Sequence, residues 1–130
     1  MKKAFFLLLA VAALASCKNK SSVKKFEVKG TIINNTAKMI YLEEIPMATM
    51  QAVVIDSAVI GKDGKYELKT VASEARVYNL RLDQSVYPVA AVINDVSSIT
   101  LDATFNKENN QFVEKYEVKG SASSQQLKDF

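Results

Sequence analysis

Residues suited to chemistry are few in this chain of 130 residues, and they are scattered along it. There is no histidine, and Cys17 is the only cysteine. The sequence therefore offers no Ser-His-Asp or Cys-His set for nucleophilic catalysis, and no ligand cluster of the kind that zinc requires. Its four glycines are single and far apart, so a glycine-rich phosphate loop is also absent. We expect no catalytic residue, no metal site and no cofactor, and hence no enzyme in this chain alone.

Cys17 stands at the end of a segment that is typical of an export signal. Lys2 and Lys3 precede the apolar run Ala4–Ala13, and small residues follow this run. The run is shorter than the roughly 20 apolar residues that span a membrane, so the segment indicates a secretory signal peptide. Leu14-Ala15-Ser16-Cys17 resembles the bacterial lipobox, which implies cleavage before Cys17 and a diacylglycerol on its sulfur. We predict a lipoprotein signal peptide over residues 1–16 and a lipid-anchored tether over 17–25.

The charge balance and the anchor restrict the partners of this protein. Without Lys2 and Lys3, the 17 basic residues of the chain fall to 15 against 14 acidic ones, and this near balance argues against nucleic acid. Acylated Cys17 would leave no thiol for a disulfide. The positions after Cys17 lack an acidic cluster resembling the surface-export signal of some lipoproteins, so we expect an envelope protein held by its lipid at the outer membrane and facing the periplasm.

Two polar pairs within predicted strands have more than one interpretation. Glu43-Glu44 could form a general acid/base pair, but neighbours on a strand point to opposite faces, so we interpret them as solvated edge residues. Asp56-Ser57 interrupts an apolar stretch. These two side chains could belong to a site, or they could satisfy a bulge or bond to the backbone, which is the more common role.

The remaining candidates are dispersed acids and tyrosines. Loop oxygens such as those of Asp95 or Asp102 could hold calcium, although the acids of this chain form no cluster. Strand tyrosines can form an interface patch, but they lie more often at the edge of a core. The chain has five tyrosines at such positions, namely Tyr41, Tyr66, Tyr78, Tyr87 and Tyr116.

The stretch Val53–Thr70 carries the plainest structural pattern. A β-branched run is followed by a turn ending in Asp63-Gly64, and strict polar/apolar alternation follows over Lys65–Lys69. This pattern predicts a β-hairpin in which Gly64 has a positive φ.

Elsewhere the alternation of apolar and polar residues predicts further short strands. These are expected around Phe26–Ile32, Met39–Leu42, Val77–Leu82, Val89–Ile93, Ile99–Ala103 and Phe112–Val118. About eight short strands separated by turns predict an all-β fold, an antiparallel β-sandwich over residues 26–120. The sequence Lys25–Gly30 recurs almost unchanged as Lys115–Gly120, so the first and last strands share a face pattern.

Residues 121–130 differ from the rest in character and predict the start of a helix, or a linker to a downstream domain. Ser123 or Ser124 is a suitable N-cap. Leu127 and Phe130 would then share one face of the helix, which packs on the sandwich or continues beyond this chain.

The order of several short segments resembles a known family. Val28–Ile32, Ile40–Glu43, Ile55–Ala58, Asp63–Tyr66 and Gly120–Leu127 follow one another as in an N-terminal domain of unknown function. That domain precedes a thioredoxin-like module in bacterial lipid-anchored thiol–disulfide oxidoreductases of the TlpA and peroxiredoxin-like type. The resemblance implies a sandwich domain whose redox chemistry resides in a downstream Cys-x-x-Cys.

We therefore expect a non-catalytic accessory domain of a periplasmic lipoprotein that acts with a thioredoxin-like domain or protein partner. The alternative is a stand-alone lipid-anchored binding or structural lipoprotein of the envelope without a redox role.

Overall fold

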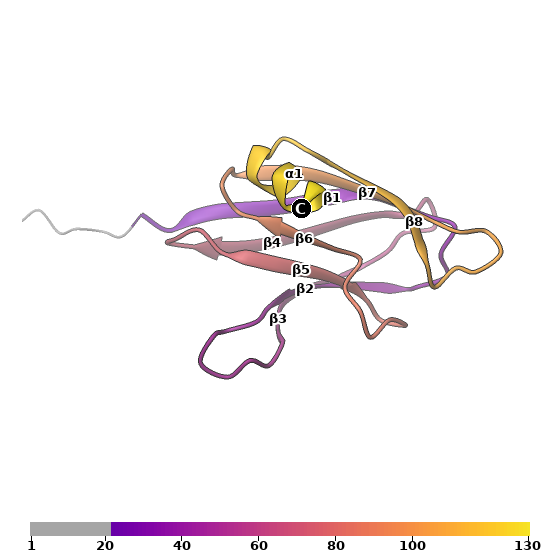
Figure 1. Cartoon of the computed structure of the whole chain (residues 1–130), viewed down its shortest axis with the longest axis horizontal. Helices are drawn as coiled ribbons and strands as arrows, with labels where there is room; N and C mark the ends of the chain where they lie inside the picture. The colour runs from indigo at the N-terminus through magenta and orange to yellow at the C-terminus, as the bar shows by residue number, and fades with distance from the viewer. Residues whose placement is uncertain (1–21) are drawn as a thin grey trace, which may run out of the picture.

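The computed structural model describes residues 22–130, which fold into two packed sheets and one C-terminal helix (Figure 1). The predicted all-β sandwich of about eight short strands with a short C-terminal helix is confirmed. Cys17 and the predicted signal peptide lie outside the described residues. The elements in chain order are β1 (Lys24–Ile33), β2 (Met39–Glu44), β3 (Val53–Val59), β4 (Lys65–Ala72), β5 (Val77–Leu82), β6 (Ala90–Ile93), β7 (Ser98–Phe105), β8 (Val113–Lys119) and α1 (Ala122–Asp129).

The two sheets have four strands each. Sheet A has the order β4-β1-β7-β8, and sheet B has the order β3-β2-β5-β6. One pair departs from the expected antiparallel arrangement, because β1 and β7 run parallel with Val28 opposite Ile99. Parallel neighbours need a long connection, and here the strands of sheet B supply most of it. The first strand also starts earlier than predicted, since Lys24 and Lys25 of the expected tether pair with Ala72 and Val71.

The predicted hairpin over Val53–Thr70 is wrong. Its two strands belong to different sheets, because β3 pairs with β2 while β4 pairs with β1. At one end of the connection, the Ile60 amide donates to the Lys38 carbonyl at 2.9 Å, and at the other the Ile32 amide donates to the Gly64 carbonyl at 2.8 Å. The connection thus crosses from sheet B to sheet A. Gly64 has the expected positive φ of 80°, and a Cβ there would lie 2.3 Å from the Ile32 carbonyl oxygen.

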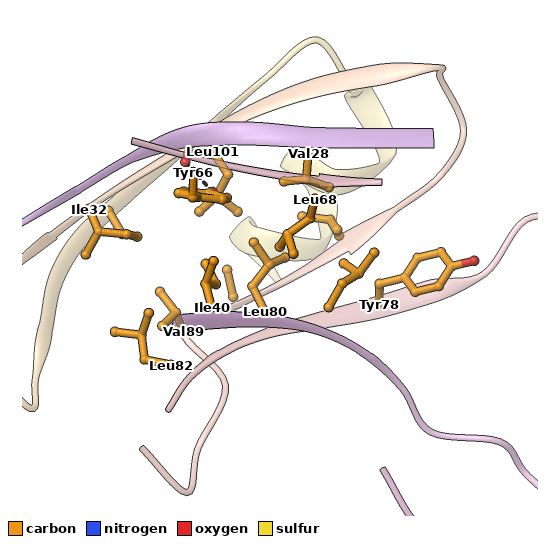
Figure 2. Packing of buried hydrophobic residues seen from close by; sticks show 14 of the residues in the cluster. Val28, Ile32, Ile40, Tyr66, Leu68, Tyr78, Leu80, Leu82, Val89 and Leu101 are labelled. Atoms are coloured by element: carbon orange, nitrogen blue, oxygen red, sulfur yellow. Dashed lines mark hydrogen bonds between the residues drawn. The ribbon is translucent and has the colours of Figure 1, made fainter. Parts of the chain in front are cut away.

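The core fills the space between the sheets with alternate residues of the strands other than β3, which has no buried residue (Figure 2). Val28, Leu68 and Leu101 from sheet A face Ile40 and Leu80 from sheet B, and each is fully buried. The hydroxyl of Tyr66, a residue only 5% exposed, donates to the Leu101 carbonyl at 2.6 Å. Burial raises the pKa of Tyr66 well above its ordinary range, and the nearby Asp102 carboxylate raises it further. This phenol therefore stays neutral and serves the core as a donor.

The two similar hexapeptides lie in one sheet, on either side of β7. Val28 in β1 and Val118 in β8 are both buried, so the prediction that these two strands share a face pattern is confirmed. Their glycines have different roles. Gly30 lies where a Cβ would meet the Leu101 carbonyl oxygen at 1.7 Å, whereas Gly120 has a φ of 97° and turns the chain into α1. Of these two glycines, only Gly120 therefore lies at a bend.

The helix begins after Ser121, not after Ser123 or Ser124. Ser121 has extended backbone angles, and its side chain accepts a hydrogen bond from the Ser124 amide at 3.0 Å. Ser124 points inward and is fully buried, while Phe130 is fully exposed, so the expected Leu127 and Phe130 face does not hold α1 in place. In residues 22–130, no helix has the length and apolar character needed to cross a membrane.

Candidate docking surface

One edge of sheet B is covered by the helix. The Oγ atom of Ser124 accepts a hydrogen bond from the Ile93 amide at 2.9 Å and donates to the Ile93 carbonyl at 3.2 Å. The helix is fastened at its start, where the Ser121 hydroxyl donates to Asp95 Oδ1 at 2.5 Å. This hydrogen bond keeps the pKa of Asp95 below its ordinary range, with the hydroxyl and amide of Ser123 as further causes. The backbone of β6 thus finds partners in α1.

The other edge of sheet B is open. Within residues 22–130, β3 pairs with no strand other than β2, and the apolar residues that lead into it and begin it are exposed. We call this set the β3 surface, and its side chains are between 37% and 87% exposed. It consists of Ile45, Met47, Met50, Val53, Val54 and Ile55. Natural proteins seldom leave an apolar edge strand uncovered, because unpaired backbone groups and apolar side chains together invite another strand.

The local sequence explains why these residues point outward. The Pro46 carbonyl accepts hydrogen bonds from the amides of Thr49 and Met50, at 3.2 and 2.8 Å, which closes a turn after β2. Met50 has a φ of 54°, a region that non-glycine residues seldom adopt. Further on, the register shifts between Leu42 and Glu43, so Ile55 is an extra residue in β3. Such a bulge increases the twist of an edge strand.

Asp56 of β3 makes a contact on the inner side of the open edge. It lies opposite Leu42, which is buried, and its Oδ2 atom accepts a hydrogen bond from the Lys69 amide of β4 at 2.7 Å. The carboxylate thus joins the edge strands of the two sheets. The prediction that Asp56 bonds to the backbone is confirmed. Ser57 lies opposite Tyr41 and is exposed, so the structure does not bring Asp56 and Ser57 together as one site.

Glu43 and Glu44 take separate ion pairs. Glu43 is only 5% exposed, and its Oε1 atom lies 2.8 Å from Nε and 2.7 Å from Nη2 of Arg81. Glu44 pairs with Arg76 at 2.7 Å. The two carboxylates form no acid/base dyad, as predicted, but the expectation that both are solvated edge residues is wrong. β2 lies inside sheet B, so the side chain of Glu43 has neighbours on either side.

The other sequence candidates do not converge. Asp102 Oδ1 accepts a hydrogen bond from the Thr31 amide at 2.8 Å, while Asp95 is held by the start of α1. Among the described residues, no group of three or more acidic or sulfur ligands could hold a metal. The tyrosines do not form a patch, because Tyr66 and Tyr78 are buried in the core whereas Tyr87 is 79% exposed.

Sequence reasoning missed the β3 surface and the Glu43–Arg81 pair. The run Val53-Val54-Ile55 was predicted only as part of the first strand of a hairpin, and it begins an edge strand instead. The exposed Met47 and Met50 shortly before it were an available signal. No pattern in the sequence joins Glu43 to Arg81, because they are 38 residues apart.

Comparison with known proteins identifies the family but no function. No curated protein and no solved structure matches this chain. The family model that does match covers residues 26–127, from β1 into α1, and is described as a domain of unknown function. The coarser part of the sequence-based resemblance, a domain of unknown function over nearly all of the described residues, is thereby confirmed. The chain belongs to the DUF4369 family of domains.

Proposed function

We propose that this chain is a non-catalytic accessory domain of a lipid-anchored envelope protein, and that it binds a thioredoxin-like domain or protein through the β3 surface. The β3 surface is the single observation that carries the binding role. Association with thiol–disulfide oxidoreductases rests on the resemblance of Val28–Ile32, Ile55–Ala58 and Asp63–Tyr66 to the domain that precedes such modules.

The geometry of the open edge favours a partner that adds a strand. β3 pairs with β2 on one side, and on its other side no strand of residues 22–130 forms a ladder with it. A strand added there would form main-chain hydrogen bonds, while its side chains meet the apolar residues beside it. Met47 and Met50 are 87% and 69% exposed, and methionine adapts to varied partner surfaces.

Site-specific crosslinking tests this proposal. A photoreactive residue at Met47 of the full chain, in its native envelope, should capture a protein that contains a thioredoxin-like Cys-x-x-Cys. The control is Lys107, which is also exposed but lies in the β7–β8 connection, outside the β3 surface. Capture from both positions, or of no thioredoxin-like protein from Met47, would contradict the redox association.

The second candidate function is a lipid-anchored binding or structural protein without a redox role. The same crosslinking experiment separates the two, because a single non-redox partner captured at Met47 and not at Lys107 would support this alternative. The β3 surface favours both candidates equally, since it defines a place for a partner and not its chemistry.

The anchor has its own test. If Cys17 is acylated, Cys17→Ala should abolish labelling by a fatty-acid analogue and release the protein from membranes. Two or more acyl chains hold a protein stably at about 0.8 kcal/mol per buried CH₂, so the loss should be complete. A mutant that still fractionates with membranes would contradict lipid anchoring.

A further inference from the structure

A cleft of ≈ 400 Å³ opens at the end of the sandwich where the β1–β2, β5–β6 and β7–β8 connections meet. In Figure 1 this end lies on the right, away from the described N-terminal residues and from the loop before β3. The volume falls within the usual range of small-molecule sites, about 300–1,000 Å³. The cleft is lined by Asn35, Leu82, Gln84, Ser85, Val86, Tyr87, Phe105, Asn110, Gln111 and Phe112.

The lining of this cleft carries no charge at neutral pH, although 24% of the chain is charged. Leu82 and Phe105 are buried and supply an apolar floor. Tyr87 and Phe112 are 79% and 66% exposed, so their rings stand free at the rim. An exposed aromatic ring offers a flat apolar face with a polar edge, against which another flat, weakly polar face can lie.

The polar groups of the cleft are amides and hydroxyls. An amide side chain presents a donor and an acceptor together, which matches a hydroxyl group that both donates and accepts. Gln111 hydrogen-bonds to described residues only through its backbone, with its amide at the Asn109 side chain at 3.1 Å. Its own carboxamide and the phenol of exposed Tyr87 are therefore available to a ligand.

Side-chain to backbone hydrogen bonds hold the walls of the cleft in place. Asn35 Nδ2 donates to the Asn110 carbonyl at 2.7 Å, which ties the β1–β2 connection to the β7–β8 connection. The Ser85 hydroxyl donates to the Tyr87 carbonyl at 2.9 Å and fixes the turn that presents the Tyr87 ring. A binding site whose walls are ordered beforehand loses less conformational entropy when a ligand arrives.

The buried ion pair of sheet B supports the same wall. Arg81 Nη1 donates to the carbonyls of Leu82 and Ser85, at 3.3 and 3.1 Å, while Nε and Nη2 are held by Glu43. The guanidinium also lies 4.9 Å from the centre of the Tyr41 ring. The Arg81 guanidinium is thus held by several partners, one of which is the last residue of β5, Leu82, and another is Ser85 in the β5–β6 connection. Arg81 is a positioning residue for this cleft.

We propose that this cleft binds an uncharged sugar unit of a glycan. A pyranose ring presents one apolar C–H face, which fits against Tyr87 or Phe112, and a rim of hydroxyls, which fits the carboxamides. A charged ligand would find no opposite charge in the lining. The proposal is independent of the β3 surface, because the cleft shares no residue with it.

Titration of the chain with neutral trisaccharides, observed by backbone amide NMR, tests the proposal. A panel of gluco-, galacto- and manno-configured trisaccharides at millimolar concentration should give shifts confined to the three connections for at least one sugar. Phe112→Ala and Tyr87→Ala should each weaken that binding at least tenfold, which is a change of about 1.4 kcal/mol. Phe130→Ala is the matched control, since Phe130 is a fully exposed aromatic residue just after α1 and should leave the affinity unchanged.

Two further arms make the outcome decisive. Arg81→Lys should weaken sugar binding and broaden the amide signals of Leu82–Tyr87, while Met47→Lys in the β3 surface should change neither. The proposal is overturned if no sugar in the panel shifts the cleft residues, or if an anionic trisaccharide or a neutral peptide binds there more tightly than every neutral sugar. Equal losses for Phe112→Ala and Phe130→Ala would also overturn it.

Discussion

The two edges of sheet B show two ways of ending a sheet. At β6, a helix closes the edge, and the buried hydroxyl of Ser124 satisfies both backbone groups of Ile93. At β3, no described strand adds to the sheet, and the contact with β4 is made by Asp56, which accepts a hydrogen bond from the Lys69 amide. At Ile93, the β6 edge is thus occupied by hydrogen bonds to α1. The β3 edge is stabilised by the Asp56 carboxylate but stays available for pairing with another strand. β3 is therefore the edge suited to a partner.

Gly64→Val should have the largest effect on stability. Gly64 lies in the connection after β3, where the chain crosses from sheet B to sheet A. A valine would place Cβ 2.3 Å from the Ile32 carbonyl oxygen at a φ of 80°, so we expect a loss of more than about 3 kcal/mol in the free energy of unfolding. Chemical denaturation measures this loss. Gly61→Ala is the control, because a Cβ there meets only the flexible end of the Asp63 side chain, at 2.7 Å. Equal stability of both variants would contradict a constrained crossing.

Ser124→Ala tests the closed edge. The substitution leaves the amide and carbonyl of Ile93 without their partner in a buried place, so we expect a loss of about 2 kcal/mol. Hydrogen exchange of the Ile93 amide should accelerate together with that of α1. Gln125→Ala, at an exposed position of the same helix, should change little. If Ser124→Ala keeps parental stability and slow exchange, the helix does not close this edge.

Asp56→Ala tests the open edge. The loss of the hydrogen bond to the Lys69 amide should cost about 1 kcal/mol, and removal of the inward charge should increase self-association through β3. Asp56→Asn separates the two effects, because its side-chain oxygen can still accept from Lys69 while the charge is gone. Sedimentation measures association and a thermal melt measures stability. A monomeric Asp56→Ala variant would show that this charge does not protect the edge.

The smallest expected effect is the pH dependence of the closed edge. The hydroxyl of Ser121 lowers the pKa of Asp95, so the ionised form favours the folded state. This contribution is present above the ordinary aspartate pKa of about 3.9 and is lost as the pH falls through the lower folded value. Because the carboxylate is exposed, we expect less than about 1 kcal/mol. The stability difference between parent and Asp95→Asn should therefore shrink on acidification, and a constant difference would contradict this role of Asp95.

Alternation along the strands was sufficient to predict which residues form the core. Phe26, Val28 and Ile32 were expected on one face of the first strand and are at most 5% exposed, because a strand has a period of two wherever it is paired. The positive φ of Gly64 was predicted for a similar reason, since it depends on only a few neighbouring residues.

The sheet partners could not be predicted in the same way. The Asp63-Gly64 turn fits a hairpin and a crossing between sheets equally well. The two arrangements differ in whether the chain at this turn pairs with Ile32 or with the preceding strand. The Glu43–Arg81 pair and the cleft depend on chain segments that meet only after folding. Local patterns therefore predicted the elements of this domain, whereas its edges and its sites required the tertiary structure.

The parallel pair of β1 and β7 has a consequence for the order in which the chain can fold. β1 lies inside sheet A, and its partner residues in β7 come 71 residues later, as the hydrogen bond from the Thr31 amide to Asp102 shows. During synthesis, one side of β1 therefore has no partner strand until nearly the whole domain has been made. Pairings of such long sequence separation form slowly. The nascent chain must stay soluble for that time, so this domain folds late and as a unit.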